Sequence, residues 1–340
     1  MKEQKNILFI TQKRKDAIGI VDDSIKKELK NLKHSFDFLE IHEKWKSTFK
    51  VIINYIRNFF LLWKRCFKYN TLYFTWENPY VIFVRLLYWT KKIVMTVHHV
   101  EDYWWKSIVW RLMIKSTNKF IAISNFTKNQ LIWIWAKEKD IFVNYNWISD
   151  VYYPEPIKGF TDYQYILYVW TEAPRKNTDL LLEVFSKIHK EHPELKLVKI
   201  WKPWSEQDKI RFDNKIKELK LGNSVIIKRD FVEDDELRKW YSNALCYISL
   251  SKLEWFWLTI PEAMACWCPV IASDIWPFRE ICWDDEILVN LDDRNTAVEW
   301  IEKYINNSEF RTSQSKKWLK IIKKFNRKSN ALNLINEIKN

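Results

Sequence analysis

Glycine is the residue that this sequence most clearly lacks. It occurs only 3 times in 340 residues, although globular proteins contain about 7% Gly. Turns and helix ends need residues that tolerate a positive φ, and glycine is the usual choice. Tryptophan is abundant instead, and the 21 Trp and 3 Gly together come to about 7% of the chain. We expect most tryptophans to stand at glycine positions, as if UGA codons specifying Gly were translated as Trp. The alternative is a genuinely Trp-rich core.

Long apolar runs are also missing. No stretch reaches the ~18 residues that a membrane-spanning helix requires, because Arg57 and Lys64 interrupt the best candidate, VIINYIRNFFLLWKRCF. The first residues, MKEQKNILFI, resemble the start of a strand and not a secretion signal. Five scattered cysteines, an odd number, favour a reducing compartment over a disulfide framework. These features predict a cytoplasmic protein.

Acidic residues are scarce in the first half. Residues 1–157 hold 26 Lys and Arg against 15 Asp and Glu, whereas residues 158–340 hold 30 against 28. A basic half predicts an acidic partner. Nucleic acid is not expected, because no zinc-finger, RRM or basic-helix signature is present. An anionic membrane is the better candidate, since residues 44–68 interleave bases, aromatics and aliphatics; a core-packed helix with a basic edge would give the same pattern.

Short apolar runs alternate with helix-length segments twice over. Continuous apolar strands separated by helices indicate parallel sheets that are covered on both faces. The first series of expected strands is 6–11, 36–41, 71–76, 92–98, 119–124 and 140–146. The second is 164–170, 195–201, 224–230, 244–250, 269–274 and 285–290. The predicted fold class is α/β, with two doubly wound, Rossmann-like domains facing across a cleft.

Domain boundaries follow from a break in this pattern. The segment YYPEPIKGF (152–160) combines two prolines with one of the rare glycines. We therefore expect an N-terminal domain at 1–157 and a C-terminal domain at 158–310. Residues 311–340 should form C-terminal helices that pack back toward the N-terminal domain.

Charged residues gather where the second series predicts ligand contacts, at the carboxyl ends of strands. Arg175 and Lys176 follow the strand YILYVW and suit a phosphate, although two surface bases would look the same. Pro261 suits the first turn of a helix, whose free N–H groups favour an anion. Glu262 lies in that turn and Glu254 eight residues earlier. Two carboxylates beside a phosphate site are good acceptors for sugar hydroxyls.

These residues lie in segments with a known pattern. EWFWLTIPEAMACWCPVIASDIWPFREI (254–281) resembles the Glu-x7-Glu segment of family-4 retaining glycosyltransferases of the two-Rossmann (GT-B) type. The likeness becomes close when Gly replaces Trp at 255, 257, 267 and 276. Similar replacements make 165–185, 197–204 and 143–154 resemble the family. Thr171 departs from it, because a basic residue often stands there; Arg175 is the expected substitute.

The resemblance implies roles for particular residues. Glu254, Lys176 and His98 would be catalytic, with Glu254 on the donor sugar and Lys176 on the leaving diphosphate. Glu262 would hold the ribose. The remaining donor-binding residues would be Arg175, Phe256, Trp257, Leu258 and Thr259, with Phe231 and Val232 near the base. Gly19 would lie on the acceptor side.

The implied reaction is retaining transfer of a sugar from a UDP- or GDP-sugar to a glycan or lipid-linked acceptor in cell-surface polysaccharide synthesis. It would be that of a hexosyltransferase, peripheral on the inner face of the membrane. We expect no cofactor and no metal, since no Asp-x-Asp motif ends a strand. The cluster of His98, His99, Glu101 and Asp102 could mimic a metal site, but no second ligand group with helical spacing accompanies it.

Two other function classes share this fold. A nicotinamide dehydrogenase needs a Gly-rich turn after its first strand, and FITQKRKDAIGI does not fit even with Gly in place of Trp. A non-catalytic sugar-nucleotide or polysaccharide-binding protein on the same fold remains the alternative, since a fold does not prove chemistry.

Overall fold

The computed structural model describes residues 7–12, 25–29, 36–41, 48–100, 104–254, 258–282 and 287–340. The chain divides into two compact units. Unit 1 comprises residues 1–146 and 327–340, and unit 2 comprises 147–326. Within the described residues, each unit contains one six-stranded sheet in which all pairs are parallel. The predicted α/β class with two doubly wound sheets is confirmed.

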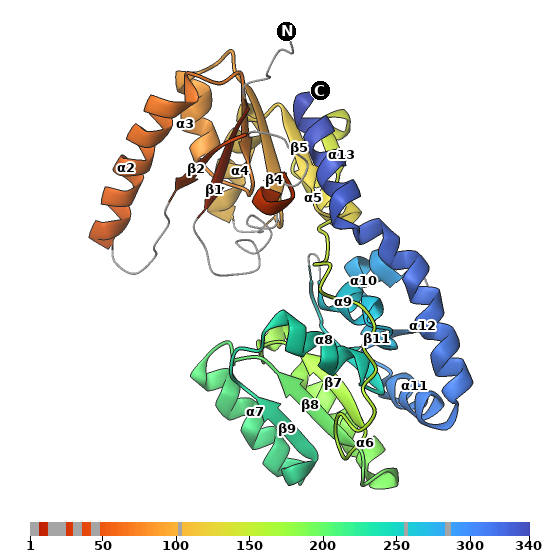
Figure 1. The fold of residues 1–340 in the computed structure, drawn as a ribbon. Coiled ribbons are helices and arrows are strands. Elements are labelled where there is room, and N and C mark those ends of the chain that lie inside the picture. Colours follow the sequence, from red (N-terminus) through yellow and green to blue (C-terminus); the bar gives the residue numbers. More distant parts are fainter. Residues whose placement is uncertain are drawn as a thin grey trace. The chain divides into compact units, whose positions relative to one another are not determined.

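Unit 1 has the strand order β2-β1-β3-β4-β5-β6. Helices α2 and α3 lie on one face of the sheet and α13 on the other (Figure 1). The strands are β1 (Ile7–Gln12), β2 (Asp37–Ile41), β3 (Thr71–Phe74), β4 (Lys92–Val97), β5 (Lys119–Ala122) and β6 (Ile141–Val143). The helices are α2 (Thr48–Cys66), α3 (Tyr80–Leu87), α4 (Trp104–Ser116), α5 (Asn125–Trp133) and α13 (Arg327–Lys339).

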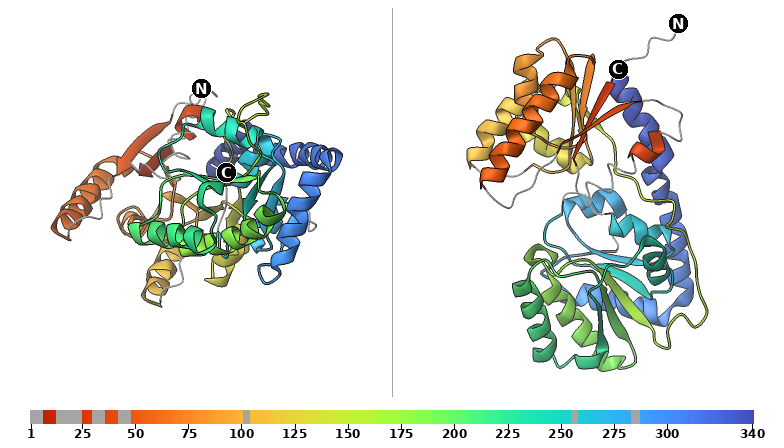
Figure 2. Two further views of the ribbon diagram at one scale, coloured as in Figure 1. Left: turned by 90° about the horizontal axis from the view of Figure 1, so that it is seen from below. Right: turned by 60° about the vertical axis from the view of Figure 1, so that its left-hand side comes forward.

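Unit 2 has the order β12-β11-β10-β7-β8-β9. Helix α6 packs between α7 and α11, whereas α9 packs between α8 and α12, and Figure 2 gives two further views. The strands are β7 (Tyr165–Val169), β8 (Lys196–Ile200), β9 (Val225–Lys228), β10 (Cys246–Ser249), β11 (Val270–Ser273) and β12 (Leu288–Val289). The helices are α6 (Thr178–Glu191), α7 (Glu206–Glu218), α8 (Asp234–Ser242), α9 (Thr259–Ala265), α10 (Trp276–Cys282), α11 (Arg294–Asn306) and α12 (Ser308–Ile322).

Helix ends show how the shortage of glycine affects the backbone. After α5, the N–H of Trp135 donates to the carbonyl of Ile132 and the N–H of Ala136 to that of Leu131. This pattern is a Schellman motif, whose first residue past the cap is left-handed and usually Gly. Trp135 takes that place with φ +73°. Trp267 takes it after α9 with φ +62°.

The chain passes between the two units near residue 147 and again between α12 and α13. Residues 147–164, which lead into β7, contact unit 2: the Tyr152 hydroxyl donates to Asp234 over 3.0 Å, and the Ile157 N–H donates to Asn243 over 2.7 Å. Unit 2 therefore begins at 147, before the predicted junction at 157/158. Helix α12 belongs to unit 2 and α13 to unit 1, where the Lys92 ammonium donates to the Ile338 carbonyl over 3.0 Å.

Candidate active site

The switch point of the unit 2 sheet lies between β7 and β10, because the chain builds outward from β7 on one side and from β10 on the other. Ligands of open α/β sheets bind at such a point, outside the carboxyl ends of the strands. The loop after β7 carries Arg175 and Lys176, and the loop after β10 carries Glu254. The topology therefore brings these two loops together.

The three charged side chains meet there. The Lys176 ammonium donates to Glu254 Oε1 over 2.6 Å, and Arg175 Nη1 donates to Glu254 Oε2 over 2.6 Å. The side chain of Lys176 is fully buried, whereas that of Arg175 is 32% exposed. Pro174 starts the short 3-10 turn that positions both bases, and Asn177 ends it in a left-handed conformation. One carboxylate thus bridges two cations.

Burial dominates the electrostatics of Lys176. It lowers the pKa of the Lys176 ammonium to about 6, with a further lowering by Arg175, although Glu254 acts in the opposite direction. A lysine in this state gains charge when a second anion approaches, because a negative charge at close range favours the ammonium form. The arrangement is suited to holding an additional anionic group.

Glu262 lies in the first turn of α9 and accepts a hydrogen bond from the Tyr241 hydroxyl over 3.2 Å. Burial, with Asp234 nearby, raises the pKa of Glu262 to about 8, although the bond from Tyr241 opposes the shift. Thr259 begins the same helix, and its hydroxyl is 2.6 Å from that of Tyr247. Leu258 precedes it as the cap residue.

The predicted base-binding residues differ in exposure. Phe231, which follows β9, is 71% exposed, and Val232 is buried. The exposed ring of Phe231 has its centroid 6.0 Å from that of Trp201. Phe256, Trp257 and the acceptor-side Gly19 fall outside the described residues.

Two tryptophans occupy the carboxyl ends of β7 and β8. The rings of Trp170 and Trp201 are stacked, with centroids 5.3 Å apart and planes 11° from parallel. The Lys176 ammonium lies 5.3 Å from the centroid of Trp170. Both residues have positive φ, +156° and +118°. The stacked pair lies directly beside Arg175 and Lys176. The sequence predicts that both tryptophans stand at strand ends, but it does not predict that their rings stack.

A buried ion pair connects β8 with the loop after β7. The Lys199 ammonium lies 2.6 Å from the carboxylate of Glu172, and neither side chain is exposed. The ammonium also donates to the carbonyl of Trp201 over 2.6 Å. Burial lowers the pKa of Lys199, against the effect of Glu172. We did not predict this pair, because a lysine in the strand LKLVKI reads as an exposed residue.

The predicted catalytic histidine lies in unit 1. His98 follows β4, is buried, and donates from Nε2 to the Thr75 carbonyl over 3.1 Å. The backbone N–H of His98 donates to the Glu77 carboxylate over 2.9 Å, and His99 Nδ1 is 2.8 Å from the same carboxylate. Burial raises the pKa of Glu77, but the two histidines outweigh it and the pKa is lowered. Sequence reasoning missed Glu77, although it is the only acidic residue between 48 and 92.

Among the described residues, no group of three or more His, Cys, Asp or Glu is placed to hold a metal ion. Likewise, no helix in the described part of the chain is long and apolar enough to cross a membrane.

Known proteins match both the sequence and the fold. Residues 154–320 match the family model of glycosyl transferases group 1. An uncharacterized glycosyltransferase of Methanocaldococcus jannaschii is 26% identical over 213 residues, which cover 62% of this chain and 56% of the relative. The chain thus spans little more than half the length of that relative.

Solved structures share the fold over nearly the whole chain. A glycosyltransferase of Rickettsia africae superposes with a TM-score of 0.80 at 19% identity, covering 98% of this chain and 97% of the other. HepE of Anabaena, in complex with UDP and glucose, gives 0.77 at 15% identity, with 98% and 99% covered. Sucrose-phosphate synthase of Thermosynechococcus elongatus gives 0.78 at 16% identity, with 97% of each chain covered. These are GT-B folds. Residues 154–320 therefore resemble a glycosyl transferases group 1 domain, and the predicted enzyme class, glycosyltransferase, agrees with that match.

Proposed function

We propose that the protein is a retaining, family-4 glycosyltransferase that moves a hexose from a UDP- or GDP-sugar to a glycan or lipid-linked acceptor in cell-surface polysaccharide synthesis. The observation that carries this proposal is the bridge of Lys176, Glu254 and Arg175 at the switch point of a group 1 domain. HepE in complex with UDP and glucose and its complex with UDP-glucose favour UDP as the nucleotide.

The chemistry follows from the charges at this point. When the bond between sugar and diphosphate breaks, negative charge develops on the leaving oxygen, and fixed cations in a site that excludes water stabilise that charge. Lys176 and Arg175 would supply the cations. Glu254 would accept hydrogen bonds from the sugar, and Glu262 from the ribose. No metal would be needed, because the two bases neutralise the diphosphate.

Transfer from UDP- and GDP-sugars tests this proposal. Lys176→Ala should lower the rate by ~10²–10³-fold, as the loss of one electrostatic partner of a transition state does. Lys190→Ala, an exposed lysine on α6, is the matched control and should transfer like the parent. If UDP and GDP bind but no acceptor is glycosylated, the non-catalytic binding protein becomes the better reading. Equal rates for Lys176→Ala and the parent would remove the assignment of this site.

We further propose that Trp stands for Gly, through UGA codons, at 170, 201, 255, 257, 267 and 276, and now also at 135. Support comes from the backbone. The described non-Gly residues with positive φ are four tryptophans, Asn177 and Lys220. A left-handed conformation costs a residue with a side chain roughly 1–2 kcal/mol, which Gly avoids. Sequencing the gene decides the matter, since UGG at these codons contradicts the proposal.

The stacked indoles have a consequence for donor binding. Trp170 and Trp201 fill the space beside Lys176, where the proposal puts the diphosphate. The double variant Trp170→Gly/Trp201→Gly should therefore bind UDP at least about 10-fold more tightly than the parent, because two rings no longer compete with the ligand. Trp135→Gly relieves the same kind of backbone strain in unit 1 and is the matched control. Calorimetric titration with UDP measures the difference.

We also propose that unit 1 binds an anionic membrane. Ile56, Phe60 and Phe67, on and just after α2, and Phe83 and Leu86 on α3 are exposed; we call these five the apolar patch. The two helices lie side by side, since the Tyr88 hydroxyl donates to the Trp63 carbonyl. Residues 48–92 contain eight Lys and Arg and only one acidic residue. Apolar side chains among bases fit an interface of acyl chains and anionic headgroups.

Vesicle sedimentation tests the membrane proposal. Binding to anionic vesicles should fall steeply as salt rises, because each base near the surface contributes about 1 kcal/mol that ions screen. Phe60→Ser/Phe83→Ser should weaken binding further, whereas Ile210→Ser, an exposed apolar residue on α7, should not. Equal binding to neutral and anionic vesicles would contradict the proposal.

A further inference from the structure

Unit 2 contains a second ligand-sized hollow, at the end of its sheet opposite the candidate active site. Its walls include Gln164, Leu245 and Pro269, the residues just before β7, β10 and β11. The candidate active site lies at the carboxyl ends of the same strands. The hollow measures about 470 Å³, within the usual range of roughly 300–1,000 Å³ for small-molecule sites.

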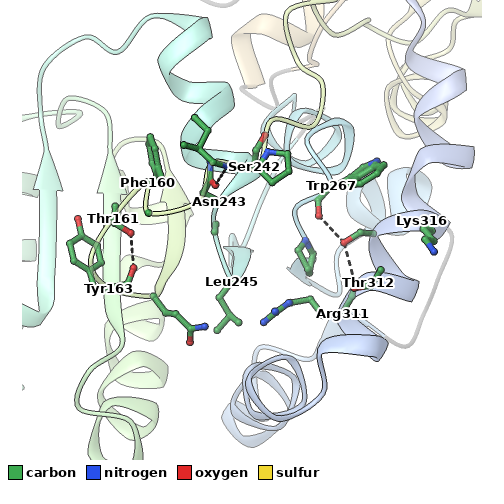
Figure 3. Close-up of a pocket in the computed structure, with 17 residues that line it drawn as sticks. Phe160, Thr161, Tyr163, Ser242, Asn243, Leu245, Trp267, Arg311, Thr312 and Lys316 are labelled. Carbon is green, nitrogen blue, oxygen red and sulfur yellow. Dashed lines mark hydrogen bonds between the residues drawn. The ribbon is translucent and has the colours of Figure 1, made fainter.

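The charges that line this hollow all have one sign. Arg311 and Lys316, both on α12, are its ionisable cations, and no Asp or Glu is among its lining residues. Neither base forms an ion pair with a carboxylate in the part of the chain that the structure describes. Arg311 reaches into the hollow, whereas the exposed Lys316 lies on the other side of α12 (Figure 3). An uncompensated guanidinium in a concave site attracts an anion, and the low-dielectric walls strengthen that attraction.

Arg311 is held in place for such a contact. Its Nη1 donates to the Tyr304 carbonyl over 3.2 Å, near the end of α11. The side chain is half-buried, and Figure 3 shows it extending from α12 into the hollow toward Leu245. A guanidinium has five N–H donors in a planar fork. One bond to Tyr304 orients the group, and its remaining donors suit the oxygens of a phosphate.

The other walls are aromatic and polar. Phe160, Tyr163 and Trp267 contribute rings, and Thr161 and Thr312 contribute hydroxyls. An aromatic ring provides an apolar surface for the C–H face of a sugar. Both hydroxyls already donate, to the carbonyls of Tyr163 and Ser308, so their oxygens can accept hydrogen bonds from sugar hydroxyls. If Trp267 is exchanged for Gly, the hollow loses one aromatic side chain. Helix α12, which carries Arg311 and Lys316, stays attached, because the Ser315 hydroxyl donates to the backbone carbonyl of residue 267 and not to its side chain.

We propose that this hollow binds a sugar monophosphate, with the phosphate on Arg311, the charge of Lys316 at the rim adding to the attraction, and the sugar against the aromatic walls. The site would be separate from the donor site and does not depend on the proposed transfer reaction. A ligand here contacts α12 and the starts of β7 and β10, so it would act as an effector of unit 2 and not as a substrate.

Calorimetric titration of the full chain with glucose 6-phosphate tests this proposal, with inorganic phosphate and glucose as the two halves of the ligand. Arg311→Gln keeps a donor for Tyr304 but removes the charge, so affinity for glucose 6-phosphate should fall at least about 10-fold. Lys316→Ala should weaken binding in the same direction. Lys320→Ala, an exposed base on α12 outside the hollow, is the matched control and should bind like the parent. Thermal melting verifies that Arg311→Gln is folded; if it is not, Lys316→Ala carries the test.

The possible outcomes separate this site from the donor site. Glucose 6-phosphate binding that persists in Lys176→Ala and is not displaced by UDP supports the second site, even if no transfer is ever detected. Displacement by UDP, or equal affinity in the parent, Arg311→Gln and Lys316→Ala, overturns it. If inorganic phosphate binds as tightly as glucose 6-phosphate, the sugar assignment is wrong.

Discussion

Replacing Glu254 by Gln is the sharpest test of the bridge between the two active-site loops. Glu254 accepts two bonds of 2.6 Å, from Lys176 and Arg175, and its side chain is 2% exposed. Glu254→Gln keeps the shape but leaves two cations without an acid. Removing one partner of a buried pair costs about 3–5 kcal/mol. We expect the lower end of that range, because Arg175 is partly exposed and can turn toward solvent.

The size of this loss should depend on pH. Burial lowers the pKa of Lys176 to about 6, below its value in the unfolded chain, so the folded protein binds fewer protons than the unfolded one above that pH. Stability therefore rises with pH through this window. Glu254 raises the pKa of Lys176 in the parent, so the pKa of this lysine falls further in Glu254→Gln, and the folded variant loses more of the proton binding that stabilises the parent at pH 5 than at pH 8. Urea unfolding at the two pH values should show the larger loss at pH 5.

Two comparisons make this prediction refutable. Glu218→Gln breaks an exposed ion pair with Lys215 of 2.8 Å and should cost less than about 1 kcal/mol. UDP should stabilise Glu254→Gln more than it stabilises the parent, since its diphosphate replaces the missing charge; a tenfold gain in affinity corresponds to about 1.4 kcal/mol. If Glu254→Gln is no less stable than Glu218→Gln, or if UDP stabilises both proteins equally, the bridge neither holds the loops nor faces a nucleotide.

Two further predictions concern Glu262 and the tryptophans. Burial raises the pKa of Glu262 from 4.5 to about 8, so its contribution to stability is fully present below pH 4.5 and is lost as pH rises through 8; Glu262→Gln should flatten that part of the stability profile, and an unchanged profile would contradict the shift. Trp135→Gly and Trp267→Gly should each raise the free energy of unfolding by about 1 kcal/mol, because they relieve a positive φ at exposed positions. Trp240→Gly should lower it by about 3–5 kcal/mol, since Trp240 is a buried helix residue; chemical denaturation measures all three, and a loss at 135 and 267 would count against the glycine interpretation.

The strands were predictable because a parallel sheet buries both faces. All five residues of β7 are buried, and such a strand reads as a continuous apolar run. Strand order then brings together the loops after β7 and β10, so that Lys176 and Glu254, 78 residues apart, contact each other. Their direct contact was not predicted. The resemblance assigns each charge to the ligand, whereas in the structure the charges bind one another.

Side-chain contacts between residues at the ends of neighbouring strands were harder to predict where neither residue belongs to a recognisable sequence motif. Glu77 follows β3 and His99 follows β4, and the 2.8 Å contact between the Glu77 carboxylate and His99 Nδ1 depends on the register of the two strands. Lys199 and Glu172 likewise meet because β7 and β8 pair. A polar residue next to a strand end gives no indication in the sequence of its partner, since exposure is the usual state of such residues.

Trp135 and Trp267 show how the surrounding chain sets the backbone conformation of a single residue. A side chain normally disfavours a positive φ, but the surrounding chain can impose one. At a helix end, the two hydrogen bonds of a Schellman motif fix the backbone conformation of the residue between them. At 135 and 267 those bonds form even though the side chain is an indole. The neighbouring sequence therefore specifies a left-handed residue at each position, independently of the residue found there. This is the pattern expected if the sequence around each position was selected with glycine in place, and it connects the shortage of glycine in the composition with the backbone angles of the fold.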